Sequence, residues 1–431
     1  MRRFRFSDPD FQTAFAAFTD ERRETPEDVD LVVRDVLASV RAEGLTALLR
    51  FAREFDRVDL DETTIRVSDD EIEAGAAACQ QAVRDAIAFA AERIRNYHLR
   101  QRPQDARFTD DAGVELGWRW TPLESVGIYV PGGRAAYPST VLMNAVPAAA
   151  AGVERIAMVT PPGRLEPAVL AAAKAAGVTE IWRVGGAQAV AALAYGAGPI
   201  RPVDKIVGPG NAYVTAAKRR VYGVVGIDAL AGPSEIVVVA DGANTPAWIA
   251  ADLLSQAEHD PAAQSILITD DETFAARVEA AVAEQLTVLA TGKDAAASWR
   301  DHGAVIIAPL DEAPGLVDRI APEHVEFAVD DPEGLADRVR HAGAIFLGRY
   351  APEAIGDYVA GSNHVLPTSR AARFSSGLSL YDFLKRTSFV KLDEASFGAL
   401  APSTVALAEA EGLPAHARSV AIRMGQGGGK P

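Results

Sequence analysis

The sequence predicts an α/β protein built on parallel sheets. Two stretches, residues 125–221 and 236–347, alternate short apolar runs with helical segments, and glycine-rich or proline-rich turns follow several of the runs. Because strands that alternate with helices of about 10–15 residues are typical of βαβ units, each stretch is expected to form a parallel sheet. The 431 residues suffice for about three domains of ~150 residues each.

Residues 8–106 are predicted to be mainly helical. Apolar residues recur at helical spacing over residues 27–53 and again over 72–97. The short acidic segment between them, residues 58–67, fits either a strand or a loop. Nothing in this region suggests chemistry, so it is expected to form a packing layer.

The first alternating stretch contains glycine turns that suit a phosphate. Its expected strands and helices are strands 126–130, 155–159, 180–184 and 205–207, and helices 138–151, 165–176, 187–195 and one ending at Val221. The turns between a strand and a helix are Pro131-Gly132-Gly133, Gly185-Gly186 and Gly208-Pro209-Gly210. Free backbone N–H groups and the helix dipole favour phosphate at such turns. None has G-x-G-x-x-G spacing, so tight turns and nucleotide binding both remain open.

The second alternating stretch has fewer glycine turns. Its expected elements are strands 236–240, 265–269, 304–308, 325–328 and 344–347, and helices 248–258 and 272–285. From about residue 379 the pattern changes to a different C-terminal segment, which ends in the glycine-rich residues 425–429.

Composition excludes several classes of partner and compartment. There are 43 basic and 59 acidic residues, a formal charge of −16 without a basic stripe, so nucleic acid is not an expected partner. No apolar run reaches the ~18–20 residues that span a bilayer, so no membrane is expected. The single cysteine, Cys79, cannot form an internal disulfide, which favours a reducing compartment, the cytoplasm.

Four short segments carry candidate chemistry. Gln256 and His259 are three residues apart at the end of a predicted helix, where an amide oxygen and an imidazole can bind one divalent metal. A histidine that only caps the helix is the alternative. Glu323 and His324 precede a strand and offer two proton-transfer groups of different pKa, although this segment taken alone favours a solvated turn.

The other two segments lie nearer the C-terminus. Residues 350–364 read as a polar loop in which Asp357 offers a hard oxygen ligand and His364 a ligand or a substrate contact. A polar surface loop is the alternative. His416 follows Pro414 at an expected helix start, where a histidine is ordinarily a surface residue.

Taken in order, eight segments of the chain resemble the histidinol dehydrogenase family, from about residue 20 to the end. They are VGIYVPGG (126–133), VGGAQAVAALA (184–194), KIVGPGNAYV (205–214), AGPSEIVVVAD (231–241), DLLSQAEHD (252–260), APEHVEF (321–327), AIGDYVAGSNHVLPT (354–368) and EGLPAH (411–416). The resemblance implies a homodimeric, zinc-dependent enzyme that oxidises L-histidinol through L-histidinaldehyde to L-histidine with two NAD⁺. These are the last two steps of histidine biosynthesis.

The resemblance also implies the domain plan. It consists of two incomplete Rossmann-like domains, a helical N-terminal segment and a C-terminal tail that is swapped in the dimer. The expected bounds are 1–22 for the N-terminal helical extension, 23–126 plus 236–378 for the domain with the metal and catalytic residues, 127–235 for the NAD⁺ domain, and 379–431 for the tail.

Site residues follow from the same resemblance, position by position. Glu323 and His324 match the catalytic pair. One zinc ion per subunit would be held by Gln256, His259, Asp357 and His416, the last donated by the neighbouring subunit. These four ligands and His324 would also contact the substrate, together with Ser234, His364 and Glu411, and Glu411 would reach across the dimer. NAD⁺ would be held by Tyr129, Gln188 and Asn211.

Two functions of other kinds remain open on the sequence. A zinc-dependent hydrolase on an α/β scaffold would use the same ligands to activate water. A metabolite-sensing or nucleotide-sensing module would bind ligand without turnover, but it leaves Glu323 and His324 beside the metal ligands without a role.

Overall fold

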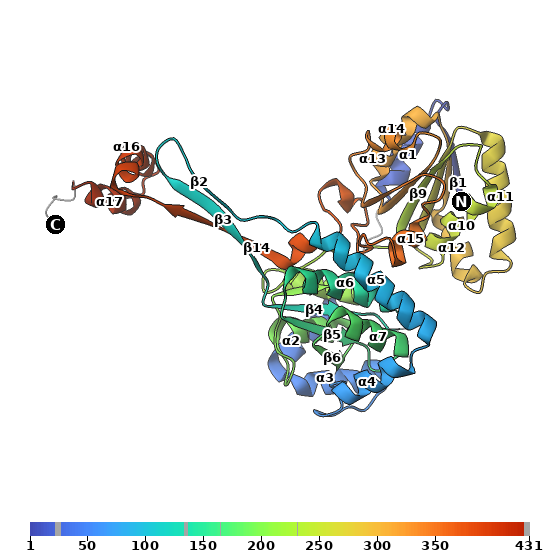
Figure 1. The fold of residues 1–431 in the computed structure, drawn as a ribbon. Coiled ribbons are helices and arrows are strands. Elements are labelled where there is room, and N and C mark those ends of the chain that lie inside the picture. Colours follow the sequence, from blue (N-terminus) through green and yellow to red (C-terminus); the bar gives the residue numbers. More distant parts are fainter. Residues whose placement is uncertain (22–26, 133–136, 164, 231, 426–431) are drawn as a thin grey trace. The chain divides into compact units, whose positions relative to one another are not determined.

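A computed structural model describes residues 1–21, 27–132, 137–163, 165–230 and 232–425. Gly133 of the first glycine turn, Ala231 of the AGPSEIVVVAD segment and the glycine-rich end beyond Gly425 lie outside these residues. The chain divides into two compact units, one of residues 1–101 and 123–383 and the other of residues 102–122 and 384–431. The first unit contains two parallel sheets, which confirms the predicted α/β class (Figure 1).

The larger sheet has six strands, and all of its pairings are parallel. In spatial order the strands are β1 (Arg2–Arg5), β11 (Ala304–Ile307), β10 (Gln264–Thr269), β9 (Glu235–Ala240), β12 (His324–Ala328) and β13 (Ala344–Leu347). The central strands β9 and β12 are buried at every residue. Such strands read as continuous apolar runs because both faces of the sheet are covered. The surrounding helices are α1 (Phe11–Asp20), α10 (Pro246–Ala257), α11 (Glu272–Leu286), α12 (Gly292–His302), α13 (Ala313–Ile320), α14 (Pro332–Ala336) and α15 (Glu353–Tyr358).

The N-terminal residues belong to this sheet. The expectation was a separate helical extension over residues 1–22, but β1 pairs with β11 along the edge. Helix α1 buries Phe11, Phe15 and Phe18 in the same core as Val237 and Ile266. A four-residue strand that contains three arginines gives too short an apolar pattern to be recognised from sequence.

The second sheet has five parallel strands. In order they are β6 (Glu180–Arg183), β5 (Arg155–Thr160), β4 (Ser125–Tyr129), β7 (Lys205–Val207) and β8 (Gly226–Ile227). Four helices connect its strands or follow them: α6 (Pro138–Ala151), α7 (Pro167–Ala176), α8 (Gly186–Tyr195) and α9 (Ala212–Val221).

The N-terminal helices pack against the helices that flank this five-stranded sheet (Figure 1). They are α2 (Glu27–Glu43), α3 (Leu45–Phe51), a five-residue π-helix (Ala52–Asp56), α4 (Asp69–Ala78) and α5 (Gln81–Leu99). Val33 and Leu48 share one core with Leu193 and Ile206, and α4 and α5 contact α7 and α6. The expected grouping of residues 23–126 with 236–378 therefore differs from the packing. An apolar stripe shows that a helix covers a sheet, but not which sheet.

Both predicted N-terminal helices are interrupted. Gly44, in the left-handed region at φ +58°, separates α2 from α3. Residues 79–80 separate α4 from α5, and residues 58–67 form no strand beyond a single bridge from Arg66 to Trp182. Cys79 is buried.

The second unit is a small antiparallel sheet with two helices. Strand β14 (Leu384–Lys391) pairs along its whole length with β3 (Glu115–Pro122), and β3 pairs with β2 (Ala106–Thr109). Helices α16 (Glu394–Ala410) and α17 (Pro414–Ala421) follow. The expected tail of residues 379–431 thus needs the distant hairpin of residues 102–122 to complete its sheet. No described helix is long and apolar enough to cross a membrane.

Candidate active site

The candidate site lies at the amino ends of β9 and β12. These strands are parallel neighbours, with His324 opposite Ile236, so Glu235 and Glu323 meet at the same edge. Helix α10 brings its C-terminal end to this edge, and α15 contacts α10. Ligands in open α/β sheets more often bind at the carboxyl edge. This sheet uses the opposite edge.

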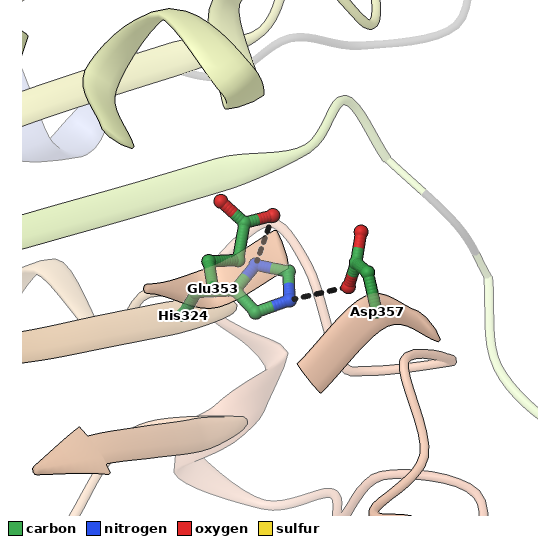
Figure 2. Close-up of side chains that lie close together, drawn as sticks. All are labelled: His324, Glu353 and Asp357. Atoms are coloured by element: carbon green, nitrogen blue, oxygen red, sulfur yellow. Dashed lines mark ion pairs between the residues drawn. The ribbon is translucent and has the colours of Figure 1, made fainter. Parts of the chain in front are cut away.

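His324 is the centre of the site. Its Nδ1 lies 3.8 Å from Glu353 Oε1, and its Nε2 lies 3.8 Å from Asp357 Oδ1, so the ring stands between two carboxylates (Figure 2). Nδ1 is also 3.2 Å from the carbonyl oxygen of Glu235. Because a carbonyl only accepts, the proton is assigned to Nδ1 and the Nε2 lone pair is free.

Burial keeps the His324 ring neutral. Desolvation, together with the neighbouring His259 and His364, lowers the pKa of His324 to about 3. Among the described residues, His324 Nε2 has no hydrogen-bond partner. A buried, neutral imidazole with a free lone pair is suited to accept a proton or to bind a metal.

Carboxylates crowd around this ring. Glu323, which accepts a 3.0 Å hydrogen bond from the Glu235 N–H, has its pKa raised well above the usual value by burial. Burial also raises the pKa of Glu353, and that of Asp357 to about 7. In the described part of the chain, the ion pairs of these three groups are with His324 alone. Three buried carboxyl groups without a lysine or arginine partner favour a bound cation, because a cation would neutralise their charge.

The amide of Gln256 is oriented by its neighbours. Gln256 is fully buried near the end of α10. Its nitrogen donates to both Glu353 oxygens at 2.6 and 3.0 Å, and its oxygen accepts from the Glu235 N–H at 3.2 Å. The orientation leaves the amide oxygen, the atom that binds metals, turned away from the carboxylate.

Glu353 was not predicted from the sequence. The segment of residues 350–364 was expected to be a loop, but residues 353–358 form helix α15. Glu353 and Asp357 are four residues apart and therefore share one helix face. That spacing was the available signal, but a six-residue helix is too short to show apolar periodicity.

Further predicted residues surround the cluster. His259 is exposed in the turn after α10, since the helix ends at Ala257, before the predicted end. His364 Nδ1 lies 3.1 Å from the Asp357 carbonyl oxygen, and desolvation lowers the pKa of His364 to about 4. Ser234 directly precedes β9, where its carbonyl accepts from the Gln264 N–H at 2.9 Å.

Two predicted residues belong to the second unit. Glu411 follows α16 as its C-terminal cap, and His416 lies in the first turn of α17. Both are exposed in that unit. The predicted donation of these side chains across a dimer stays a prediction.

The predicted NAD⁺ residues gather at the carboxyl edge of the five-stranded sheet. Tyr129 ends β4, and its hydroxyl accepts a 3.0 Å hydrogen bond from the Gly186 N–H. Gln188 is buried on α8. Asn211 caps α9, where its side-chain oxygen accepts from the N–H groups of the next turn.

Two of the glycine turns are less open to a phosphate than expected. The Gly186 N–H is bonded to Tyr129, and the Gly208 N–H donates to Asp228 Oδ2 at 2.7 Å. The predicted free donors at these two positions are therefore already engaged. Close packing accounts for the glycines: a Cβ at Gly208 would lie 2.3 Å from the Tyr129 carbonyl oxygen.

The residues present fit a divalent cation. His324, Glu353 and Asp357 each offer one ligand atom within 4.8 Å of the others. Of the zinc ligands predicted by resemblance, only Asp357 belongs to this trio, while Gln256 contacts it through Glu353. Nitrogen and oxygen donors in an acidic, buried setting suit zinc.

Comparison with known proteins identifies the family. The family model described as histidinol dehydrogenase matches residues 19–424. The histidinol dehydrogenase of Caulobacter vibrioides is 79% identical over 427 residues, which are 99% of this chain and 100% of that protein. The chain belongs to the histidinol dehydrogenase family.

Other members agree with this assignment. The histidinol dehydrogenase of Rhodospirillum rubrum is 62% identical over 99% of each chain. The crystal structure of histidinol dehydrogenase from Elizabethkingia anophelis superposes with a TM-score of 0.93 at 36% identity over 98% of each chain. Family membership makes the chain an oxidoreductase for alcohol and aldehyde groups in histidine biosynthesis, and it does not favour the hydrolase alternative.

Proposed function

We propose that the chain oxidises L-histidinol through L-histidinaldehyde to L-histidine with one zinc ion per subunit and two NAD⁺ in succession. The observation that carries the proposal is the neutral, buried His324, whose ring lies between two acidic side chains and whose Nε2 lone pair is unpartnered among the described residues. Gln256, His259 and Asp357 would hold the zinc, together with His416 of a second subunit.

Zinc would orient the imidazole and amine of histidinol, and each NAD⁺ would accept one hydride. In the first oxidation, His324 Nε2 accepts the proton of the alcohol as the hydride leaves carbon. Its Nδ1–H keeps donating to the Glu235 carbonyl oxygen, so the ring keeps one orientation throughout.

The second oxidation needs water. Glu323 removes a proton from water as the water adds to the aldehyde, and His324 returns the proton from the first oxidation to the aldehyde oxygen, which completes the gem-diol. His324, neutral again, then deprotonates the gem-diol while the second hydride leaves. Glu323 is held by the Glu235 N–H and lies 3.8 Å from the His324 ring, so the two bases are positioned side by side. Ser234, His364 and Glu411 would complete the substrate contacts.

Charge favours the five-stranded half for NAD⁺. The carboxyl edge of the six-stranded sheet is a groove of about 740 Å³ lined by seven acidic residues: Asp241, Asp270, Asp271, Glu272, Asp311, Asp330 and Asp331. A pyrophosphate would be repelled there. The carboxyl edge of the other sheet likewise presents helix N-termini, but the side chains of Tyr129, Gln188 and Asn211 there carry no negative charge.

Subunit arrangement and location belong to the same proposal. We place the active site in a homodimer with an exchanged tail, because two of the proposed site residues, Glu411 and His416, lie exposed on the small second unit. A cytoplasmic location follows from the biosynthetic family and the single buried thiol.

Absorbance of NADH tests the proposal directly. With L-histidinol and NAD⁺, the enzyme should form two NADH per histidinol, lose this activity on chelation and regain it with Zn²⁺. Absence of NADH from a folded, zinc-loaded preparation would refute the proposed chemistry. Activity that survives complete removal of the metal would refute the zinc part alone.

A further inference from the structure

A buried ion pair holds one of the glycine turns of the five-stranded half. Lys218 on α9 and Asp228 just after β8 form an ion pair, and their side chains are only 2% and 5% exposed. Lys218 Nζ donates to the Gly208 carbonyl at 2.9 Å, while Asp228 Oδ2 accepts from the Gly208 N–H at 2.7 Å. The two charged groups therefore hold Gly208 through both of its backbone polar groups.

The held residue is in a conformation that only glycine adopts easily. Gly208 has φ +110°, and a Cβ there would lie 2.3 Å from the Tyr129 carbonyl oxygen. The turn after β7 thus runs directly against the end of β4. The Asp228 N–H also donates to the Ile206 carbonyl at 3.2 Å, which fixes the carboxylate relative to the strand.

The pair connects this turn to helix α9. Asn211 caps the helix, and Lys218 lies seven residues further on, two turns along the same face. By binding Gly208, the Lys218 ammonium ties the body of the helix to the turn that precedes it. The position of Asn211 relative to Tyr129 is set by this connection.

Stability alone does not account for such a pair. Two apolar side chains of similar volume are often as stable as a buried ion pair, or more stable. Apolar side chains, however, could neither donate to the Gly208 carbonyl nor accept from its N–H. What the charged pair adds is the fixed geometry of one turn.

We propose that Lys218 and Asp228 are a positioning pair for NAD⁺: by fixing the Gly208 turn they align Tyr129 and Asn211, without touching the cofactor themselves. This rests on the proposed NAD⁺ contacts of those two residues. The affinity for NAD⁺ is then expected to depend on the pair, while the affinity for histidinol does not.

The test is the double variant Lys218→Met/Asp228→Leu, which fills the space without leaving a lone buried charge. The KM for NAD⁺ should rise about tenfold, the effect of one or two lost hydrogen bonds. The KM for histidinol and the kcat at saturating NAD⁺ should stay within about twofold of the unmodified enzyme. An unchanged KM for NAD⁺ would overturn the proposal.

A matched control lies at the amino end of β7, the strand that precedes the Gly208 turn. Lys205 donates to the side chain and carbonyl of Asp382 at 2.8 and 2.9 Å. Lys205→Met/Asp382→Asn should leave the KM for NAD⁺ unchanged, and an equal rise in this control would show a general loss of packing instead.

If the first double variant does not fold, Asp228→Glu keeps both charges but displaces the turn. It should raise the KM for NAD⁺ alone, and a KM equal to that of the unmodified enzyme contradicts the proposal. The dissociation constant for NAD⁺, measured by calorimetry without substrate, should rise with the KM in the first double variant. An unmodified enzyme that binds NAD⁺ but forms no NADH from histidinol therefore refutes the proposed function, while the binding measurement still tests the positioning role.

Discussion

The two parallel sheets of the first unit place their candidate sites at opposite edges. On the six-stranded sheet the site lies at the amino ends of β9 and β12. Glu323, His324 and Glu353 are buried there, and the two carboxyl groups have no lysine or arginine partner among the described residues. On the five-stranded sheet it lies at the carboxyl ends of β4 and β7, where Lys218 and Asp228 satisfy each other around Gly208. The first arrangement contains groups that can accept a proton or bind a metal, whereas the second fixes the conformation of one turn.

The edges differ because of how βαβ units run. A helix that follows a strand starts at the carboxyl edge and ends at the amino edge, so its positive N-terminus lies at one edge and its negative C-terminus at the other. Helix α10 accordingly delivers Gln256 from its C-terminal end to the amino edge. A cation is favoured there, whereas the beginning of α9 carries the positive end of its helix dipole and is capped by Asn211.

The largest effect is expected from a substitution at the amino edge of the six-stranded sheet, where Glu323 and His324 lie. Glu323→Gln should spare the oxidation of histidinol to the aldehyde and slow the oxidation of the aldehyde by about 10²–10⁴-fold, because only the second step needs water to be activated. Single-turnover NADH formation from histidinol and from histidinaldehyde separates the steps. Equal losses in both would contradict the division of roles between Glu323 and His324.

A smaller effect is expected from Glu353, which contacts His324 and Gln256. Glu353→Gln removes the negative charge that faces His324 and accepts from the Gln256 amide, so zinc affinity should fall about 10–100-fold. Competition with a chelator measures it. Asp241→Asn is the control: it removes a carboxylate paired with Arg349 at the other end of β9 and should leave zinc affinity unchanged. A Glu353→Gln protein that holds zinc normally would exclude the orienting role.

The smallest effect concerns the five-stranded half, where most buried charged groups have a partner. Asp56, at the end of the π-helix on this half, is an exception, because desolvation raises its pKa to about 6 from 3.8. The protonated form is favoured by folding, so the stability linked to Asp56 is present below about pH 4 and is lost as the pH rises through 6. Asp56→Asn should then stabilise the protein by about 1–2 kcal/mol at pH 8, after allowance for its partial exposure, and not at pH 4.

Thermal melting at the two pH values measures this difference. Asp61→Asn provides a contrast of opposite sign, because hydrogen bonds from Thr63 and Thr64 lower the pKa of Asp61 to about 2. Its stabilising effect is present above about pH 4 and is lost as the pH falls through 2. Loss of stability at pH 8 in both variants would show that the Asp56 carboxylate is not strained by burial.

The sequence predicts the buried parts of the fold better than their grouping. Strands β5, β7 and β9 were predicted within one or two residues because a buried parallel strand is a short apolar run between turns. The sequence did not predict that α2–α5 pack on the five-stranded half. An apolar stripe shows that a helix is covered, but not which half of the protein covers it. Strand β1 was missed because its partner is about three hundred residues away.

The same limit applies to the site. Gln256, Glu323, His324 and Asp357 carry motifs that the chain shows directly, and the structure brings them to one edge. Glu353 acts through two other side chains, so its contribution is visible only once the contacts are known. The engaged N–H groups of Gly186 and Gly208 could not be seen either, because their acceptors are distant in sequence.

The pairing of β1 with β11 has a consequence for the order of synthesis. The partner of residues 2–5, residues 304–307, is synthesised about 300 residues later. At about 5–20 residues per second, the first strand waits roughly 15–60 s with its backbone donors and acceptors unpaired. Its three arginines, Arg2, Arg3 and Arg5, keep it charged during that interval, which protects an exposed edge from pairing with another nascent chain.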